Sequence, residues 1–404
     1  MNINEKFVEK DSGRRVILVN TWRVVNARGG AEKVFCDMAN ALDAMGYNVT
    51  AICLDLKKGM PGFSLSNGVR FVNAGRWGCP IYCRGLLKTI RAFSFNREVR
   101  HKKRKEIDLS WKIKLLGKEI EDVGGADVYI SFQPETTYLM SRLQCVNAPI
   151  VTMFHFEPNR LFEIMCKDIL EVKSALRSSR MITVLLPSYV DQVRKLYSGT
   201  EVVAIPNAIP YFENASSLDS KKIVCVGRVA QQKRVELLIE AFAIASNEIP
   251  DWCVEYWGET DVEPTYKDKI FQLVGRLGLQ DRFCFCGATD NVERVLTSAS
   301  IFAFPSAFEG YSLALGEAMS KGLPVIGCVD CAGTNEMIEN KNNGLLVAPN
   351  PQAFAEALVS LAKSRSLRIE LGMGARKYIQ RCSPEAIWSA WNSLILGLVK
   401  EKEN

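Results

Sequence analysis

Histidine is scarce in this chain, which limits the metal chemistry that it can support. Only His101 and His155 occur among the 404 residues. The 13 cysteines are odd in number, and the single Cys-x-x-Cys pair, Cys328 and Cys331, has no second pair nearby. Because a structural zinc ion needs about four ligands, we expect buried free thiols and no metal site.

Long apolar runs are also missing. No stretch approaches the roughly 18 continuous apolar residues that a membrane span needs. The first residues are polar and include Glu5, Glu9 and Asp11, unlike a signal peptide. We therefore expect a cytoplasmic protein with no membrane-spanning helix of its own.

Basic residues are concentrated in the first half of the chain. The net charge of +6 combines +10 for residues 1–209 with −4 for residues 210–404. Nine Lys or Arg residues fall within 84–105 against one acid, Glu98, and apolar and aromatic residues lie among them. A solvated helix face is one interpretation, and a surface for an anionic partner, membrane lipid or nucleic acid, is the other. An amphipathic segment of this kind can lie in a lipid interface.

The hydrophobic pattern predicts a parallel α/β protein. Residues 16–20 have the composition of a buried strand, 31–45 have helical spacing, and 49–54 are typical of the next strand. A polar segment without periodicity, 207–222, is interpreted as an interdomain linker. Further strands are expected at 128–132, 149–154, 181–186, 201–205, 223–226, 252–257, 283–286, 301–304 and 324–327.

The length of the chain favours two domains over one core. We predict two Rossmann-like domains that face a central cleft. Ligands of such sheets lie beyond the carboxyl ends of the strands. The expected parts are a polar extension at 1–14, domains at 15–207 and 208–380, and a C-terminal helix at 381–404 that packs back on the first domain.

The most informative segment is FPSAFEGYSLALGEAM, residues 304–319. It places Glu309 in the loop after a predicted strand and Glu317 about a turn and a half into the following helix. Both carboxylates are expected to face one site, and a carboxylate is a good acceptor of hydrogen bonds from the paired hydroxyls of a ribose. The alternative is a pair of surface glutamates that bind nothing.

The residues between the two glutamates are suited to an anion. Gly310 allows the backbone to turn and to approach a ligand closely. The amides of Tyr311, Ser312 and Leu313 would point out of a helix N-terminus, where the helix dipole favours a diphosphate.

This segment resembles the Glu-x7-Glu signature of glycosyltransferase family 4. GGAE (29–32) is similar to the N-terminal glycine loop of that family, and VGRVAQQKRVELLIEAF (226–242) is similar to its donor-phosphate segment. GLPVIGCVDCAGTNEMIENKNNGLLV (322–347) resembles the stretch that follows the second glutamate. The resemblance implies a GT-B fold, retention of anomeric configuration, an N-terminal acceptor domain and a C-terminal nucleotide-sugar domain. Ser312 departs from the pattern, because many members of the family have Gly or Pro there.

Carried onto this chain, the resemblance implies a role for each residue of the site. Arg228 and Lys233 would bind the donor diphosphate and stabilise the charge of the leaving group. Gly29 and Gly30 would bring backbone to the same phosphate, and Glu309 would hold the sugar hydroxyls.

His155 directly follows the predicted strand 149–154. The family places a histidine beside the transferring sugar and the acceptor, so we expect His155 and Glu309 at the reacting centre. Whether His155 acts as a base or only positions substrate is left open.

The metal-binding Asp-x-Asp motif of the other large glycosyltransferase fold does not occur in the sequence. The resemblance therefore implies a metal-independent enzyme without a cofactor, in which cationic side chains and a helix dipole replace the metal.

The hypothesis from sequence is a hexosyltransferase that uses a nucleotide-sugar, with a UDP-sugar as the expected donor, and a glycan or lipid-linked acceptor, as in bacterial surface polysaccharide assembly. Residues 84–105 would contact the inner face of the cytoplasmic membrane, and no nucleic-acid partner is expected. The alternatives are a nucleotide-sugar epimerase or glucan synthase of the same fold, and a non-catalytic protein that binds an anionic ligand. A non-catalytic binding protein would give Glu309 and Glu317 no role.

Overall fold

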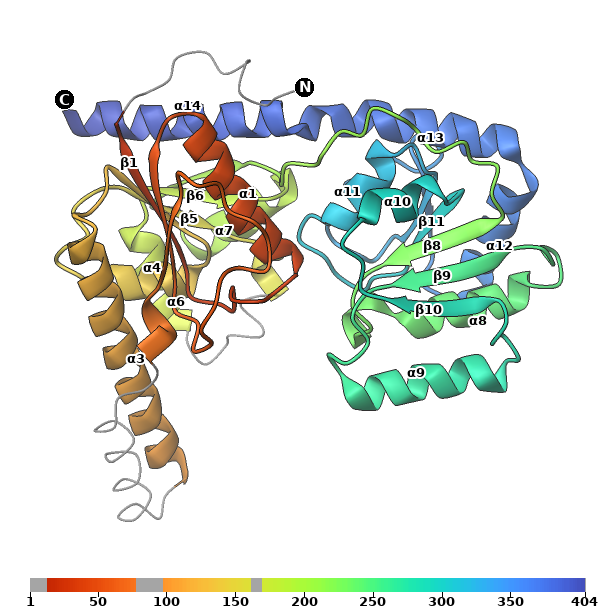
Figure 1. Ribbon diagram of the computed structural model, residues 1–404, viewed down its shortest axis with the longest axis horizontal. Coiled ribbons are helices and arrows are strands. Elements are labelled where there is room, and N and C mark those ends of the chain that lie inside the picture. Colours follow the sequence, from red (N-terminus) through yellow and green to blue (C-terminus); the bar gives the residue numbers. More distant parts are fainter. Residues whose placement is uncertain (1–12, 78–96, 161–168, 404) are drawn as a thin grey trace. The chain divides into compact units, whose positions relative to one another are not determined.

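The computed structural model describes residues 13–77, 97–160 and 169–403 and divides into two compact units (Figure 1). Unit 1 runs to Ile205 and resumes at Trp388, and unit 2 is Pro206–Ile387. The predicted boundaries lie after residues 207 and 380. Within unit 1, Tyr47 donates a hydrogen bond to Asn392 Oδ1 at 2.5 Å, which joins the end of the chain to its beginning.

Unit 1 contains a parallel sheet in the order β3-β2-β1-β4-β5-β6-β7. Its strands are short and mostly buried, which explains their continuous apolar sequences. They are β1 (Arg15–Asn20), β2 (Asn48–Cys53), β3 (Arg70–Asn73), β4 (Val128–Ser131), β5 (Ile150–Met153), β6 (Met181–Val184) and β7 (Glu201–Ala204). The described helices of this part are α1 (Gly30–Ala44), η2 (Ala74–Trp77), α3 (Arg97–Asp122), α4 (Pro134–Met140), α6 (Ile169–Ser178), α7 (Pro187–Leu196) and, from Trp388 onward, α14 (Pro384–Glu403).

Unit 2 contains a second parallel sheet, in the order β10-β9-β8-β11-β12-β13. Its strands are β8 (Lys222–Val226), β9 (Cys253–Trp257), β10 (Phe283–Gly287), β11 (Ile301–Phe304), β12 (Val325–Cys328) and β13 (Leu345–Val347). Its described helices are η3 (Gln231–Lys233), α8 (Val235–Ala245), α9 (Pro264–Arg276), α10 (Val292–Thr297), α11 (Leu313–Ser320), α12 (Pro351–Lys363), α13 (Arg365–Ile379) and η4 (Gln380–Cys382). Helix α8 packs against α9 and α12, whereas α11 packs against α13. The two parallel α/β units confirm the predicted fold class.

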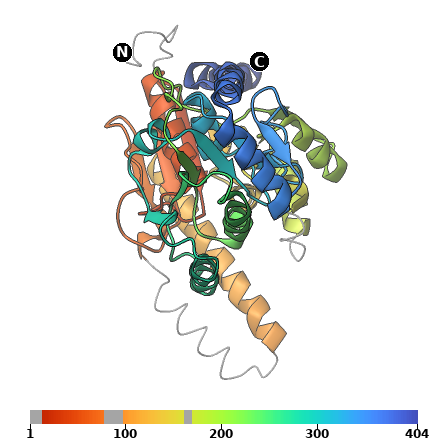
Figure 2. The same cartoon turned by 90° about the vertical axis from the view of Figure 1, so that its right-hand side faces the viewer.

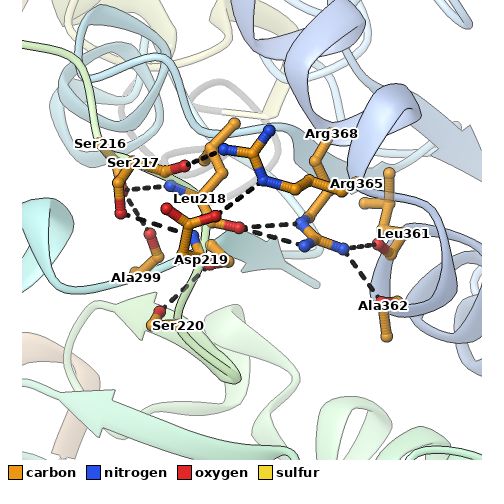
Figure 3. A network of polar contacts seen from close by, with 11 residues as sticks. Ser216, Ser217, Leu218, Asp219, Ser220, Ala299, Leu361, Ala362, Arg365 and Arg368 are labelled. Atoms are coloured by element: carbon orange, nitrogen blue, oxygen red, sulfur yellow. Dashed lines mark hydrogen bonds and ion pairs between the residues drawn. The ribbon is translucent and has the colours of Figure 1, made fainter.

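The segment interpreted as a linker is attached to unit 2 (Figure 3). Ser216 Oγ donates a hydrogen bond to the carbonyl of Ala299 at 2.6 Å. The buried guanidinium of Arg368 donates to the carbonyl of Leu218 and to two carbonyls in the last turn of α12. Arg365 Nε donates to Asp219 Oδ1 at 2.7 Å. Residues 207–221 contain no helix or strand and Lys222 already begins β8, but these bonds make the segment part of unit 2 and not a free connection, which corrects the interpretation from sequence.

None of the helices in the described part of the chain combines the length and the apolar character needed to cross a membrane.

Candidate functional site

Both sheets reverse their strand order at one point, between β1 and β4 in unit 1 and between β8 and β11 in unit 2. The strands on the two sides of such a point send their connections to opposite faces of the sheet. This opens a crevice at the carboxyl ends of the strands, where ligands of doubly wound folds bind. The turns after β8 and β11 are therefore the part of unit 2 best placed to hold a ligand.

An ion pair joins these two turns. Lys233 Nζ lies 2.5 Å from Glu309 Oε1, and the side chains are only 15% and 10% exposed. The ammonium group also lies 5.2 Å from the ring centre of Phe304, the last residue of β11. The structure thus brings together two residues that are 76 positions apart in the sequence. Both had been predicted to lie at the site.

Two hydrogen bonds to backbone carbonyls also connect these two turns. Gln232 Nε2 donates to the carbonyl of Phe308 at 2.8 Å, and the amide of Ala307 donates to the carbonyl of Gln232 at 2.8 Å. A Cβ atom at Gly227 would lie 3.2 Å from Lys233 Cε. The missing side chain at Gly227 therefore leaves room for the stem of Lys233 to reach Glu309.

A third turn, after β12, completes the arrangement. The amide of Glu309 donates to the carbonyl of Ala332 at 3.2 Å. Gly333, at φ +84°, lies so close that a Cβ atom there would be 2.5 Å from the carbonyl oxygen of Gly310. Glycine is required at this position both for its conformation and for the close approach.

The third turn also contacts the first. Arg234 donates two hydrogen bonds to Asp330, from Nη1 at 3.0 Å and from Nη2 at 2.7 Å. Arg234 has φ +43°, a left-handed conformation that is unfavourable for a residue with a side chain. We call the connected turns 227–234, 305–312 and 329–333 the three-turn frame.

Helix α11 begins where the sequence predicts. Ser312 is its N-cap, and Ser312 Oγ accepts a hydrogen bond from the amide of Leu315 at 3.3 Å. This capping explains Ser312, because serine is among the residues preferred at an N-cap. Leu313 is the first residue of the helix, so the positive end of the helix dipole lies at the three-turn frame.

The remaining predicted residues of this segment are buried. Tyr311 accepts a hydrogen bond on its carbonyl from Asn207 Nδ2 at 3.0 Å, and its hydroxyl lies 2.8 Å from Cys382 Sγ. Gly310 is buried, and Glu317 is only 7% exposed within α11. Tyr311 therefore fixes the loop through its packing, while its amide remains close to the helix N-terminus.

Arg228 lies at the first turn, two residues after β8, with an exposed side chain. Its carbonyl accepts a hydrogen bond from the buried hydroxyl of Tyr256 at 3.1 Å. The backbone is therefore anchored, and the guanidinium is accessible to a ligand.

The predicted residues of unit 1 are found at the same kind of edge. Gly29 is the N-cap of α1 and Gly30 is its first residue. A Cβ atom at Gly29 would lie 2.3 Å from Glu32 Oε2, so a carboxylate already lies against this helix N-terminus. A phosphate at the same place would meet that negative charge, and a phosphate-binding role for the two glycines stays a prediction.

His155 follows β5 by two residues, and its ring stacks on Phe132 with centroids 5.0 Å apart. Among the described residues Nε2 has no hydrogen-bond partner, and it is buried. Burial lowers the pKa of His155 from 6.5 to about 4, so the ring is neutral at neutral pH. A group of such low basicity is a weak general base.

The predicted Cys-x-x-Cys pair consists of buried free thiols, as expected. Burial raises the pKa of Cys328 to about 11 and that of Cys331 to about 12. Since the thiolate is the form that binds metal, these neutral thiols are suited to packing.

The predicted site residues thus fall into two groups. His155, Gly29 and Gly30 belong to unit 1, and Arg228, Lys233, Glu309 and the 310–317 segment belong to unit 2. Joint action of the two groups stays a prediction. Sequence reasoning missed the supporting contacts of Phe304, Gln232, Arg234, Asp330, Ala332 and Gly333. No local pattern signals them, because each contact joins turns that are far apart in the chain.

Comparisons with known proteins find similarity to glycosyltransferases. Residues 220–364 match the family model "Glycosyl transferases group 1". An uncharacterized glycosyltransferase of Haemophilus influenzae is 23% identical over 92% of this chain and 97% of its own length. The lipopolysaccharide core biosynthesis glycosyltransferase LpsE of Rhizobium meliloti is 24% identical over 91% of this chain and 96% of its own length.

Solved structures show the same fold. Sucrose-phosphate synthase from Thermosynechococcus elongatus aligns with a TM-score of 0.78 at 19% identity, over 96% of this chain and 100% of the other. Anabaena HepE in complex with UDP and glucose aligns with a TM-score of 0.72 at 15% identity, over 95% of this chain and 100% of the other. The matched family model spans β8 to α12 and includes the whole three-turn frame. The chain therefore has the GT-B fold, and its residues 220–364 are similar to the glycosyl transferases group 1 domain.

Proposed function

We propose that this chain is a retaining, metal-independent hexosyltransferase that moves a sugar from a UDP-sugar to a glycan or lipid-linked acceptor. The observation that carries the proposal is the buried Lys233–Glu309 pair at the strand-order reversal of a glycosyl transferases group 1 domain. One cation and one carboxylate, fixed side by side, match a donor whose diphosphate is anionic and whose sugar carries hydroxyls.

Each group of the site has a role in this reaction. Lys233 and the exposed Arg228 bind the diphosphate and stabilise the charge that develops as the sugar leaves. The ammonium group has three donors, so Lys233 can keep its bond to Glu309 while it donates to a phosphate oxygen. Glu309 holds the sugar hydroxyls and Glu317 the ribose hydroxyls. The N-terminus of α11 supplies a further positive potential for the diphosphate.

His155 orients the reacting groups on the acceptor side. Its neutral ring offers one donor and one acceptor nitrogen, and its low pKa disfavours a role as a proton acceptor at neutral pH. We therefore favour orientation of the reacting groups over general base catalysis. Cationic side chains and the helix dipole take the part that a metal ion plays in other transferases, without a cofactor.

The comparisons support the choice of substrates. HepE binds UDP and glucose, and LpsE acts in lipopolysaccharide core biosynthesis. By analogy we assign a UDP-sugar as donor and a growing surface glycan, free or lipid-linked, as acceptor.

The basic segment 84–105 is proposed to contact the anionic inner face of the cytoplasmic membrane. Residues 78–96 lie outside the described residues, and Arg97 begins α3. Lys102 to Lys105 are all exposed in the first half of this helix. A cluster of this kind attracts anionic lipid with a strength that falls as salt rises.

The proposal is tested by ligand screening followed by transfer assays. A panel of UDP-, GDP- and ADP-sugars is screened for protection against thermal unfolding, because a ligand that binds the native state raises Tm. Transfer by Glu309→Gln and Lys233→Ala is then measured with the protective donor. The matched control is Lys221→Ala, an exposed lysine paired with Asp251. Unchanged transfer rates in both site variants would refute the proposed site.

The same assay separates the alternatives. An epimerase converts the nucleotide-sugar without an acceptor, a glucan synthase extends its own product, and a binding protein gives protection without turnover. The anomeric configuration of the product, determined by NMR, decides between retention and inversion.

A further inference from the structure

Unit 1 exposes two large apolar side chains in one short loop. Residues 56–60 follow β2, and Leu56 and Met60 are 64% and 60% exposed. Lys57 and Lys58 lie between them and are exposed as well. Single exposed apolar residues are common on protein surfaces, but two of this size around two lysines form an apolar and basic tip.

The loop is well anchored despite its exposed side chains. Asp55 Oδ1 accepts a hydrogen bond from the amide of Lys57 at 3.0 Å, and Asn73 Nδ2 donates to the carbonyl of Lys57 at 2.7 Å. The carbonyl of Met60 accepts from the amide of Asn26 at 3.1 Å. Asp55 is itself buried, so the acidic residue next to the loop does not neutralise its surface.

Helix α3 extends beyond the same edge of the sheet. Its 26 residues span about 39 Å, whereas the longest strands of unit 1 have six residues and span about 20 Å. The end of α3 leads into the start of β4, so its first half must project past the carboxyl ends of the strands (Figures 1 and 2). From Trp111 onward the helix is packed on unit 1, while 102–106 are exposed.

The loop and the helix are linked through η2. This short helix packs against α3, and the backbone of Gly75 lies so close to Leu54 that a Cβ atom would be 2.6 Å from its carbonyl carbon. Loop 56–60 and the basic half of α3 therefore belong to one edge of unit 1. It is also the edge at which His155 follows β5.

We propose that loop 56–60 is a membrane-insertion tip that places Leu56 and Met60 in the interface of an anionic bilayer, with Lys57 and Lys58 at the headgroups. This extends the membrane contact of the proposed function to a site that its basic segment does not include. Apolar side chains flanked by lysines are the composition of interfacial membrane contacts. The lysine stems can lie along the apolar boundary while their ammonium groups stay in water.

The charge of this edge favours a bilayer over another occupant. The four consecutive basic residues at 102–105 add to the two lysines of the loop, so the edge matches a negatively charged plane. Because the carboxyl edge of unit 1 also carries His155, the residue proposed to lie beside the acceptor, a tip at this edge brings His155 to an acceptor that is anchored in the same membrane.

The test is cosedimentation of the full chain with phosphatidylcholine vesicles, with and without phosphatidylglycerol. Leu56→Ser with Met60→Ser is expected to lower partitioning to anionic vesicles about tenfold or more. Lys57→Gln with Lys58→Gln is expected to lower it about 25-fold at low salt, about fivefold per lysine, and to have little effect at about 0.5 M salt. The matched control is Met373→Ser in unit 2, an exposed methionine that should leave partitioning unchanged.

Two results would overturn the proposal. One is wild-type partitioning by the Leu56→Ser, Met60→Ser protein, and the other is equal binding of the unmodified chain to vesicles with and without anionic lipid. Wild-type Tm and transfer to a water-soluble acceptor show that a variant is folded. If transfer persists and vesicle binding fails, only the membrane tip is refuted. If vesicle binding depends on the loop but no donor is transferred, the proposed reaction is refuted and the membrane contact stands.

Discussion

Glu309→Gln separates the contribution of the buried Lys233–Glu309 pair to donor binding from its contribution to sugar transfer. Glutamine keeps the size of the side chain and one carbonyl oxygen but removes the charge that neutralises Lys233. The Nζ to Oε1 distance is 2.5 Å and neither side chain is more than 15% exposed. Loss of one partner of a buried ion pair lowers the free energy of unfolding by about 3–5 kcal/mol. The remaining amide oxygen reduces this to about 1–3 kcal/mol, because it can still accept a hydrogen bond.

The uncompensated Lys233 has consequences that differ between binding and transfer. A diphosphate supplies the negative charge that the glutamine lacks, so we expect the affinity for UDP to be kept or raised, by up to about tenfold. Transfer should fall by about 10²–10³, the range for loss of one well-placed group in the transition state. Lys233→Ala should lower both, because it leaves Glu309 facing an anion.

Titration calorimetry with UDP and initial transfer rates measure the two effects. Glu255→Gln is the matched control, because Glu255 pairs with Lys222 at 2.6 Å in the same sheet and lies outside the three-turn frame. It should change neither quantity. The reasoning is wrong if Glu309→Gln weakens UDP binding as much as Lys233→Ala does, or if it transfers sugar at the normal rate.

Three further predictions each test a single feature. Burial lowers the pKa of His155 to about 4, so its neutral ring contributes stability above about pH 6.5 that is lost as the pH falls toward 4, up to about 3 kcal/mol. His155→Phe should therefore flatten the fall in Tm between about pH 7.5 and about pH 5, and equal falls in both proteins would contradict this. Ser312→Ala removes the N-cap of α11 and should lower the free energy of unfolding by about 1 kcal/mol in denaturant titrations; no change would argue against capping. Arg368→Met leaves buried carbonyls without donors and should lower the free energy of unfolding by about 3 kcal/mol. Arg365→Met removes only an exposed ion pair and should lower it by less than about 1 kcal/mol. Equal losses in the two variants would contradict this assignment.

The fold was largely predictable because the buried strands have continuous apolar sequences. Strand β11 was predicted at its observed bounds, and the other predicted strands differ by one or two residues at their ends. Strands β3 and β13 were not predicted, because four residues with one charged end and three half-buried residues give too weak a pattern. The C-terminal half of α3 packs into unit 1 through Leu116 and Ile120, which the polar composition of its N-terminal half obscured.

The candidate site was predictable in its charged residues and not in its supports. Lys233 and Glu309 follow predicted strands and have recognisable chemistry. The contact of Asp330 with Arg234 depends on which turns become neighbours, and strand order supplies that information. At Gly29 the structure adds a contact that argues against the predicted role. The carboxylate of Glu32 lies where the sequence suggested space for a phosphate.

The left-handed Arg234 has a consequence for protein engineering. Glycine would adopt its φ of +43° without the steric cost of about 1–2 kcal/mol, so a screen for heat tolerance alone would favour Arg234→Gly. The same change deprives Asp330 of both hydrogen bonds and removes the tie between the turn that carries Lys233 and the turn after β12. Selection for turnover should therefore retain arginine where selection for thermostability discards it, and the residue at 234 in evolved variants would report which pressure had acted.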